Sequence, residues 1–308
     1  MKPSNILKLS TAAAIALTAS TPAFADWRAD MGTYNIGLLG GENESDRLRR
    51  YDCFADTMSE ALGVPVELFP ASDYAGVMQG LLAGQLHQAG LGASGYAGIY
   101  LQDPDAVSPI LTTKNVDDSL GYYSVIYVKS DSDAQSLEDL EGMSLAYADP
   151  NSTSGYLVPR AELAAAGIDD ATFFSGTGFG GGHEQAVIAV LNDQYDAGVT
   201  WTSLMGEESE GYTRGNLRRM VDNELLDMGD IRIVWESKLI PNGPTVFRND
   251  LPEEARDLAV QAMLNLKEND PACYSDTVGG EGNGFAEVDH SFYEGIVAMR
   301  EAEMAASR

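Results

Sequence analysis

The sequence contains few positive charges. Its 308 residues include 19 lysines and arginines against 47 aspartates and glutamates, which gives a formal net charge of -28. A chain this acidic repels the phosphates of nucleic acids and the anionic surfaces of lipid bilayers. We therefore expect a small molecule as the ligand and no nucleic acid partner. The hydrophobic content of 44% is that of an ordinary globular protein of one or two domains.

Histidine and cysteine are also scarce, which limits the chemistry that the chain can perform. Three histidines and two distant cysteines offer no closed metal site. His183 is followed by Glu184 but lacks the second histidine of the zinc-binding H-E-x-x-H motif. No G-x-S-x-G motif precedes a suitable acid and histidine. We expect no catalytic residue, no bound metal and no cofactor.

Long hydrophobic runs are missing as well. The apolar run Ala12–Leu17 is far shorter than the roughly 20 residues that a membrane-spanning helix needs. It follows Lys2 and Lys8 and precedes Ala23-Phe24-Ala25, which is the pattern of a secretory signal peptide cleaved after Ala25. We expect segment 1–25 to be removed and the mature chain to be exported and soluble.

The two cysteines, Cys53 and Cys273, are an isolated pair in a chain that we expect to be exported. Disulfides persist in such compartments, and an even number of cysteines favours a bridge. Two buried free thiols are the alternative.

Strand-like apolar runs alternate with amphipathic helical stretches along the chain, which predicts α/β architecture. The helix predicted at 74–84 leads into a short strand at 89–92, and a similar unit recurs where a helix beginning at His183 leads into Tyr195–Val199. This weak internal similarity indicates two lobes of similar construction.

The lobe boundaries follow from two strand-like segments, Tyr123–Lys129 and Ile231–Trp235, each of which leads into a new block of sequence. We predict that the chain crosses between lobes there. The first lobe then comprises 26–128 plus 236–308, and the second comprises 129–235. Both cysteines fall in the first lobe. The glycine-rich stretches 176–182 and 279–284 are the candidate linker segments.

Segment 143–159 carries the clearest candidate for a binding site. A predicted strand runs into a turn at 149–151 and then into a helix that starts with Ser152, Thr153 and Ser154. The first amides of a helix have no partner within it and point the positive end of the helix dipole at an anion. Three hydroxyls add donors without adding charge. The alternative is that one of them only caps the helix.

A second glycine-rich helix start, at 178–184, contains His183 in its first turn. The stretch 176–181 also matches the dinucleotide fingerprint G-x-G-x-x-G, but the following acid, Asp196, precedes a predicted strand instead of ending one, so we reject a nucleotide site. Tyr74 and Tyr122 are further candidates, because a tyrosine can donate to an oxyanion while its ring excludes water. A core position is the alternative for each of these residues.

These segments carry a resemblance to a known family. The stretches DYAG, GYYSV, DPNSTSGYLVP, GHE and LIPNGP occur in the order and spacing typical of the periplasmic phosphonate-binding proteins of ABC importers. The resemblance implies a two-lobed type II fold that closes on a phosphonate, phosphite or phosphate. It further implies a periplasmic monomer that delivers its ligand to an ABC permease in the inner membrane. The phosphonate oxygens would be held by Tyr74, Tyr122, Ser152, Thr153, Ser154 and His183.

The sequence departs from the family where the organic group of the ligand would lie. Aminoethylphosphonate binders carry acids at positions that match Ser203 and Gly243. An enclosed ammonium group needs a carboxylate or several acceptors. We therefore expect methylphosphonate, phosphite or phosphate to be preferred over aminoethylphosphonate. The alternative, that Glu207 or Glu208 fills the vacant position, remains open.

A rival function is an exported hydrolase of phosphorus esters that uses the same cleft. Hydrolysis needs a metal cluster or an activated nucleophile. The sequence offers a pattern for neither, so the binding protein is the leading interpretation.

Overall fold

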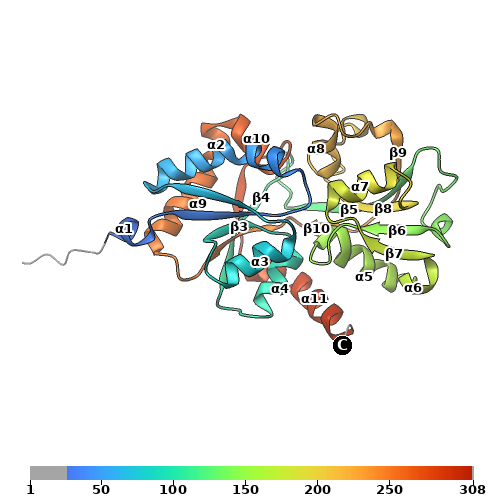
Figure 1. Ribbon diagram of the computed structural model, residues 1–308, viewed down its shortest axis with the longest axis horizontal. Coiled ribbons are helices and arrows are strands. Elements are labelled where there is room, and N and C mark those ends of the chain that lie inside the picture. The colour runs from blue at the N-terminus through green and yellow to red at the C-terminus, as the bar shows by residue number, and fades with distance from the viewer. Residues whose placement is uncertain (1–25, 307–308) are drawn as a thin grey trace, which may run out of the picture.

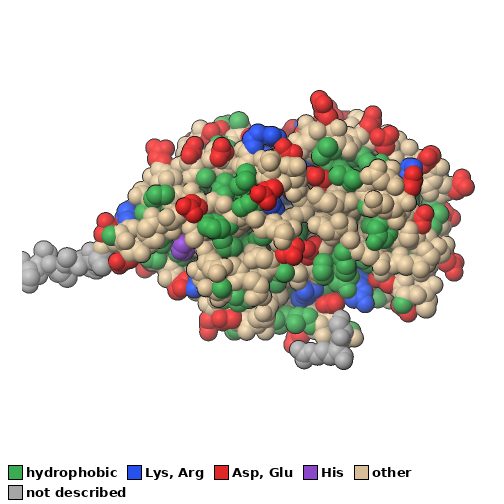
Figure 2. All heavy atoms as spheres, in the orientation of Figure 1, with side chains coloured by type: hydrophobic (Ala, Val, Ile, Leu, Met, Phe, Trp, Pro, Cys, Tyr) green, Lys and Arg blue, Asp and Glu red, His purple; other side chains and the backbone are tan. Residues whose placement is uncertain are grey.

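The computed structural model describes residues 26–306, so the predicted signal peptide lies outside the described residues. The chain forms two lobes that lie side by side, each with a mixed β-sheet flanked by helices (Figure 1). The predicted α/β, two-lobed architecture is confirmed. Acidic side chains are spread over the surface and outnumber basic ones on the face seen in Figure 2. Within 26–306 no helix is both long and apolar enough to cross a membrane.

The sheet of the first lobe has the strand order β12-β4-β11-β3-β1-β2. Strand β1 pairs in parallel with both β2 and β3, and β11 runs antiparallel to β3 and β4. Helices α2, α9 and α10 pack against the sheet in one hydrophobic cluster. Helices α3, α4 and α11 pack against it in a second hydrophobic cluster. The strands are β1 (Tyr34–Leu38), β2 (Val66–Pro70), β3 (Gln88–Gly90), β4 (Val107–Thr113), β11 (Pro244–Arg248) and β12 (Phe285–Glu287). The helices are α1 (Trp27–Met31), α2 (Glu44–Leu62), α3 (Tyr74–Leu82), α4 (Ala93–Tyr100), α9 (Glu253–Asn269), α10 (Pro271–Val278), the 3₁₀ turn η5 (His290–Tyr293) and α11 (Glu294–Ala306).

The sheet of the second lobe has the order β10-β5-β8-β6-β7, with β9 also paired to β5. Strand β6 pairs in parallel with β7 and β8, just as β1 pairs with β2 and β3, which confirms the similar construction of the lobes. The strands are β5 (Gly121–Lys129), β6 (Ser144–Tyr147), β7 (Gly176–Phe179), β8 (Ala197–Thr202), β9 (Ile231–Glu236) and β10 (Ile240–Pro241). The helices are α5 (Val158–Ala165), α6 (Asp170–Phe173), α7 (His183–Leu191) and α8 (Asn216–Asp222), with a π-helical turn η2 (Thr153–Leu157) and 3₁₀ turns η1 (Glu138–Leu140), η3 (Glu208–Glu210) and η4 (Met228–Asp230).

The sheets divide the chain at other points than the predicted 128/129 and 235/236. Strand β5 lies entirely in the second sheet, where it pairs with β8, β9 and β10. The chain therefore crosses in the polar segment 114–120 and returns at 242–243, between β10 and β11. The crossing lies in the polar stretch before β5, whereas the predicted crossing lies at the end of that strand.

The glycine-rich stretch 176–182 is not simply a linker, because its first four residues form β7. Their backbone pairs with β6, and the side chain of Tyr195 lies so close to Gly178 that a Cβ there would overlap its hydroxyl group. The glycine is needed for this contact, and its low strand propensity hides the strand in the sequence.

The first lobe is assembled from two distant parts of the chain, and a disulfide joins them. Cys53 in α2 is bonded to Cys273 in α10, with a Cα–Cα distance of 5.8 Å. This is the bridge that the even number of cysteines favoured.

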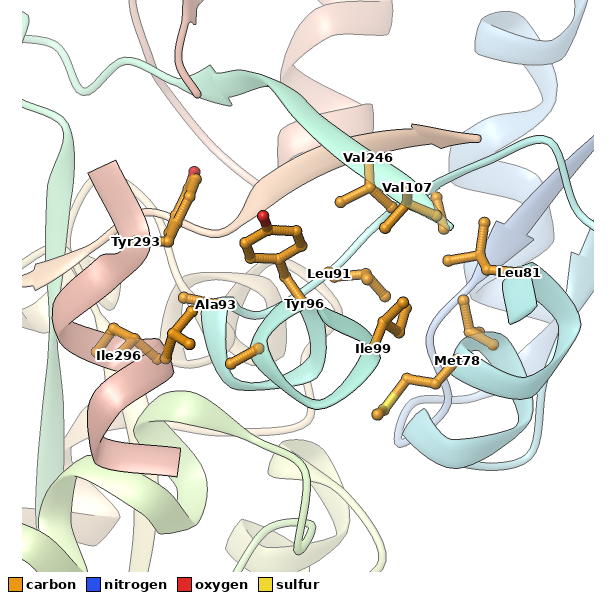
Figure 3. Packing of buried hydrophobic residues seen from close by; sticks show 14 of the residues in the cluster. Met78, Leu81, Leu91, Ala93, Tyr96, Ile99, Val107, Val246, Tyr293 and Ile296 are labelled. Carbon is orange, nitrogen blue, oxygen red and sulfur yellow. The ribbon is translucent and has the colours of Figure 1, made fainter. Parts of the chain in front are cut away.

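The C-terminal segment 290–306 packs on the first lobe close to the boundary with the second. Figure 3 shows Tyr96 of α4 facing Tyr293 and Ile296, and the rings of the two tyrosines are 5.6 Å apart. The Tyr293 hydroxyl donates to the carbonyl oxygen of Asn242 in the return crossing, at 3.0 Å. Further along α11, Arg300 donates to the carbonyl oxygen of Pro150 at 3.0 Å. The C-terminal helix thus contacts the turn that precedes the serine and threonine triplet.

Candidate functional site

A cavity of about 240 Å³ lies between the lobes. Its walls come from both sheets and from the return crossing 242–243. All six residues that the sequence singled out for binding line it: Tyr74, Tyr122, Ser152, Thr153, Ser154 and His183.

The triplet 152–154 opens a helix, as predicted, but its first turn is the π-helical η2, which continues into α5. The Ser152 hydroxyl accepts a hydrogen bond from the Gly155 amide at 3.0 Å, so this residue is the cap. The amides of Thr153 and Ser154 belong to the first turn, which has no acceptors within the helix. A capping role accounts for Ser152, whereas Thr153 and Ser154 line the cavity without being the cap.

His183 is the first residue of α7 and is only 6% exposed. Its Nε2 lies 3.0 Å from the hydroxyl oxygen of Ser152, and its Nδ1 lies 3.3 Å from that of Thr200. Burial, together with the positive charge of Arg219, lowers the pKa of His183 to about 3. The imidazole is therefore neutral at physiological pH and offers one donor and one acceptor. Gly155 permits its approach, since a Cβ there would lie 2.8 Å from the imidazole Cε1.

The two tyrosines bring hydroxyls to the triplet from different lobes. Tyr74 begins α3 of the first lobe, whose start is capped by Asp73, and its hydroxyl lies near that of Ser152. Tyr122, on β5 of the second lobe, has its hydroxyl near those of Ser154 and Thr153. Burial raises the pKa of both tyrosines, which stay neutral donors.

Thr153 is also contacted from the first lobe. Its hydroxyl oxygen accepts a hydrogen bond from the Ser94 amide, at the start of α4, with a distance of 2.9 Å. Because that bond occupies an acceptor position, the hydroxyl hydrogen remains available for a ligand.

The charged residues of this cavity were not predicted from the sequence. Arg47, Arg50, Arg214 and Arg219 line it, together with one acid, Glu42. The expectation that an anion would be held by hydroxyls, amides and His183 alone is therefore incomplete. A signal was present in the sequence: three arginines fall within 214–219 of a chain that has only 19 basic residues.

The positions proposed for selectivity separate into two groups. Gly243 lines the cavity, and a Cβ there would overlap the carbonyl oxygen of Leu91, so this position accepts no acidic side chain. Ser203 is fully buried, bonds with Thr213 at 2.8 Å and does not line the cavity. Glu207 and Glu208 are exposed and do not line it either. Within the described chain, neither glutamate occupies the vacant acidic position.

The described residues contain no group of three histidine, cysteine, aspartate or glutamate side chains placed to hold a metal ion. The dinucleotide interpretation also fails in the structure, since Asp196 precedes β8, as the sequence indicated.

Comparison with known proteins identifies the family. Residues 36–293 match the family described as "ABC transporter, phosphonate, periplasmic substrate-binding protein". The phosphonates-binding periplasmic protein of Escherichia coli is 30% identical over 235 residues, which cover 75% of this chain and 65% of that protein. The phosphate-import protein PhnD of Mycolicibacterium smegmatis is 28% identical over 258 residues, covering 79% of this chain and 76% of the relative.

Solved structures share the fold. A binding protein component of an ABC phosphonate transporter from Pseudomonas aeruginosa superposes with a TM-score of 0.76 at 25% identity, over 90% of this chain and 89% of that one. PhnD1 from Prochlorococcus marinus, solved in complex with methylphosphonate, superposes with a TM-score of 0.73 at 19% identity, over 88% and 98% of the two chains. The fold is that of the two-lobed type II periplasmic binding proteins. On the strength of the family match, the chain belongs to the periplasmic phosphonate substrate-binding proteins of ABC transporters.

Proposed function

We propose that this protein captures a phosphonate or a related phosphorus oxyanion in the cavity between its lobes and delivers it to an ABC permease in the inner membrane. It acts in the periplasm as a monomer after removal of segment 1–25, and it performs no chemistry on its ligand. The observation that carries this proposal is the convergence of the triplet 152–154, Tyr74, Tyr122 and His183 on one cavity.

The donors suit a tetrahedral oxyanion. Hydroxyls of the triplet, first-turn amides of η2 and the tyrosine hydroxyls all donate without carrying charge, and hydrogen bonds to a charged acceptor are strong in a desolvated site. His183 can supply one further N–H group. The hydrogen bonds from these donors replace the ones to water that the oxygens of the ligand lose on binding.

Because the donors come from both lobes, we expect ligand binding to favour closure of the lobes. Tyr74 and the Ser94–Thr153 bond come together with the triplet only when the lobes are in contact. A ligand that bridges the lobes stabilises the closed state by its differential affinity. The segments 114–120 and 242–243 are the only two chain connections between the sheets in the described residues, so they are the hinges of this motion.

Calorimetric titration tests the proposal. Wild-type protein is titrated with methylphosphonate, phosphite, phosphate and aminoethylphosphonate, and at least one of them should bind. Thr153→Val removes a hydroxyl at constant shape and should weaken that binding by roughly 10- to 100-fold. Thr172→Val is the matched control, because Thr172 is exposed on α6 and bonds only locally to Asp169.

Two results would contradict the proposal. The first is the absence of binding by every phosphorus compound. The second is turnover of a chromogenic phosphate ester above background in excess zinc or magnesium, which would favour the hydrolase instead.

A further inference from the structure

The lining of the cavity also includes a group of aromatic and arginine side chains built on Trp201 of β8. The guanidinium groups of Arg214 and Arg219 lie 5.5 Å and 5.4 Å from the centre of its ring. The Tyr122 ring packs edge-on against the same indole at 5.3 Å. Trp201 therefore contacts Tyr122 and a pair of arginines, and all of these residues line one cavity.

Arg214 is a buried cation without a carboxylate partner. The residue is only 5% exposed. Its Nη2 donates to the side-chain amide oxygens of Asn115 and Asn242, each at 2.8 Å. Its Nε is buried and has no hydrogen-bond partner among the described residues. A buried charge is normally compensated by an opposite one, because the cost of desolvation is otherwise not recovered.

Among residues 26–306, Arg214 forms no ion pair with a carboxylate, whereas Arg218 pairs with Asp222. Burial lowers the pKa of Arg214 to about 10, so the guanidinium stays charged at neutral pH, and the ionisable groups that influence it are Tyr274, Tyr122 and Arg219. Arg219 differs, since it forms an ion pair with Glu42.

The cavity as a whole is positive in a protein whose net charge is -28. Four arginines and one glutamate line it, so its walls carry a surplus of three positive charges (four minus one). Glu42 is shared between Arg219 and Arg50. Arg47 donates to the carbonyl oxygens of Leu39 and Ala71. A phosphonate with at most two negative charges leaves positive charge uncompensated.

The cavity also has room beyond a phosphoryl group. Its volume of about 240 Å³ is many times the ~10–15 Å³ that a single water molecule needs on the same measure. The three oxygens and the phosphorus of the ligand fill only part of this space. The cavity, whose lining includes Arg214, therefore has room for a short organic chain beyond the phosphoryl group.

We propose that Arg214 binds a second anionic group of the ligand, so that the natural substrate class is phosphonates that bear a carboxylate. This inference rests on the proposed function and names its substrate class. Apart from the two hydrogens that Nη2 gives to Asn115 and Asn242, the guanidinium keeps further N–H groups and its positive charge, which suit a carboxylate oxygen and which an ammonium or methyl group cannot use. Selectivity then differs from the sequence-based expectation of an uncharged substituent, because that expectation did not include Arg214.

A purely structural role for Arg214 is the competing explanation. Asn115 belongs to the first crossing and Asn242 to the second, so Arg214 ties both hinges to the second lobe. If that were its whole role, removing it would affect every ligand equally. The experiment must therefore compare ligands within one variant.

The test is calorimetric titration with phosphonoacetate, 3-phosphonopropionate, methylphosphonate and aminoethylphosphonate. For the wild type, one of the carboxylated compounds should bind roughly 10- to 100-fold more tightly than methylphosphonate. Arg214→Gln should remove most of that preference while changing methylphosphonate affinity by much less. Arg232→Gln is the control, since Arg232 also donates to oxygens of the second lobe, at Ser130, Ser132 and Ala134, but lies outside the cavity.

The outcomes separate the two proposals. Tighter binding of methylphosphonate or aminoethylphosphonate by the wild type would overturn the second-anion site while leaving the proposed function intact, and this comparison needs no variant. An equal loss for both ligands in Arg214→Gln would assign Arg214 a structural role and also overturn the inference. If no phosphorus compound binds, the proposed function itself is wrong.

Discussion

Ser152 and His183 are in direct contact, with 3.0 Å between the serine hydroxyl oxygen and the imidazole Nε2. The contact joins the starts of two helices, η2 and α7, that lie in different α/β units of the second lobe. Ser152 also accepts from the Gly155 amide, and Thr200 contacts the far side of the imidazole. The oxyanion donors are thus held in place before a ligand arrives.

Ser152→Ala tests this arrangement. The variant loses a hydroxyl of the cavity and releases one side of the imidazole, so we expect affinity for the preferred phosphorus oxyanion to fall by roughly 10- to 150-fold. Loss of the cap should also cost about 1 kcal/mol of stability. Calorimetry and denaturant unfolding measure the two effects. Ser132→Ala is the control, because it removes a hydroxyl outside the cavity that accepts a hydrogen bond from the Ala134 amide. Equal affinities in the two variants would contradict the prediction.

The low pKa of His183 predicts a dependence of stability on pH. The folded imidazole, with its pKa at about 3, stays neutral, whereas an unfolded one takes up a proton below about 6.5. Full stability is therefore present above that value and declines as the pH falls toward 3. Between pH 7 and pH 5 the wild type should lose about 2 kcal/mol more unfolding free energy than His183→Asn.

Urea unfolding of the ligand-free proteins at both pH values measures this difference. The comparison with His183→Asn cancels the contributions of other buried groups, such as Asp149 and Glu184, whose pKa values are raised by burial. Parallel pH profiles for the two proteins would show that His183 is protonated equally in the folded and unfolded states.

Much of this site can be predicted from short stretches of the sequence. The triplet 152–154 and His183 are found from helix starts, and Tyr74 from its place at the start of α3, because short-range geometry decides which groups a helix start exposes. The disulfide was also accessible, since Cys53 had no other cysteine to pair with than Cys273. For each of these features the sequence allowed few alternative structures or pairings.

Features that depend on contacts between distant parts of the chain could not be predicted from the sequence. The position of the Arg214 side chain depends on its hydrogen bonds to Asn115 and Asn242, which are 99 and 28 residues away in the sequence. No periodicity of the sequence links the three residues. The membership of β5 in the second sheet likewise depends on its partners β8, β9 and β10. Local pattern shows that a strand exists, but it does not show which sheet contains the strand.

The disulfide leads to a prediction about stability. Cys53 and Cys273 are 220 residues apart, and their bond restricts a very long loop in the unfolded chain. Replacing both with serine should lower the free energy of unfolding by about 2–5 kcal/mol. Neither cysteine lines the cavity, so ligand affinity should be retained. Denaturant unfolding with and without a reductant checks this, and an unchanged midpoint in the variant would show that the bridge adds no stability.

The ion pair between Glu42 and Arg219 connects the lobes and leads to a prediction about closure. Glu42 precedes α2 of the first lobe, and Arg219 belongs to α8 of the second. Beside the pair the lobes touch, since a Cβ on Gly41 would lie 2.7 Å from the Cα of Gly182. Glu42 also pairs with Arg50, but that contact stays within the first lobe.

Glu42→Gln should shift ligand-free protein toward the open state. A partly exposed ion pair contributes up to about 1 kcal/mol, so the ratio of closed to open molecules should fall by up to about five-fold. X-ray scattering should then give a larger radius of gyration for this variant than for the wild type. Arg50→Gln removes a partner of the same glutamate without removing a contact between lobes, so it should scatter like the wild type. Equal radii for Glu42→Gln and Arg50→Gln would show that the Glu42–Arg219 pair does not contribute to closure.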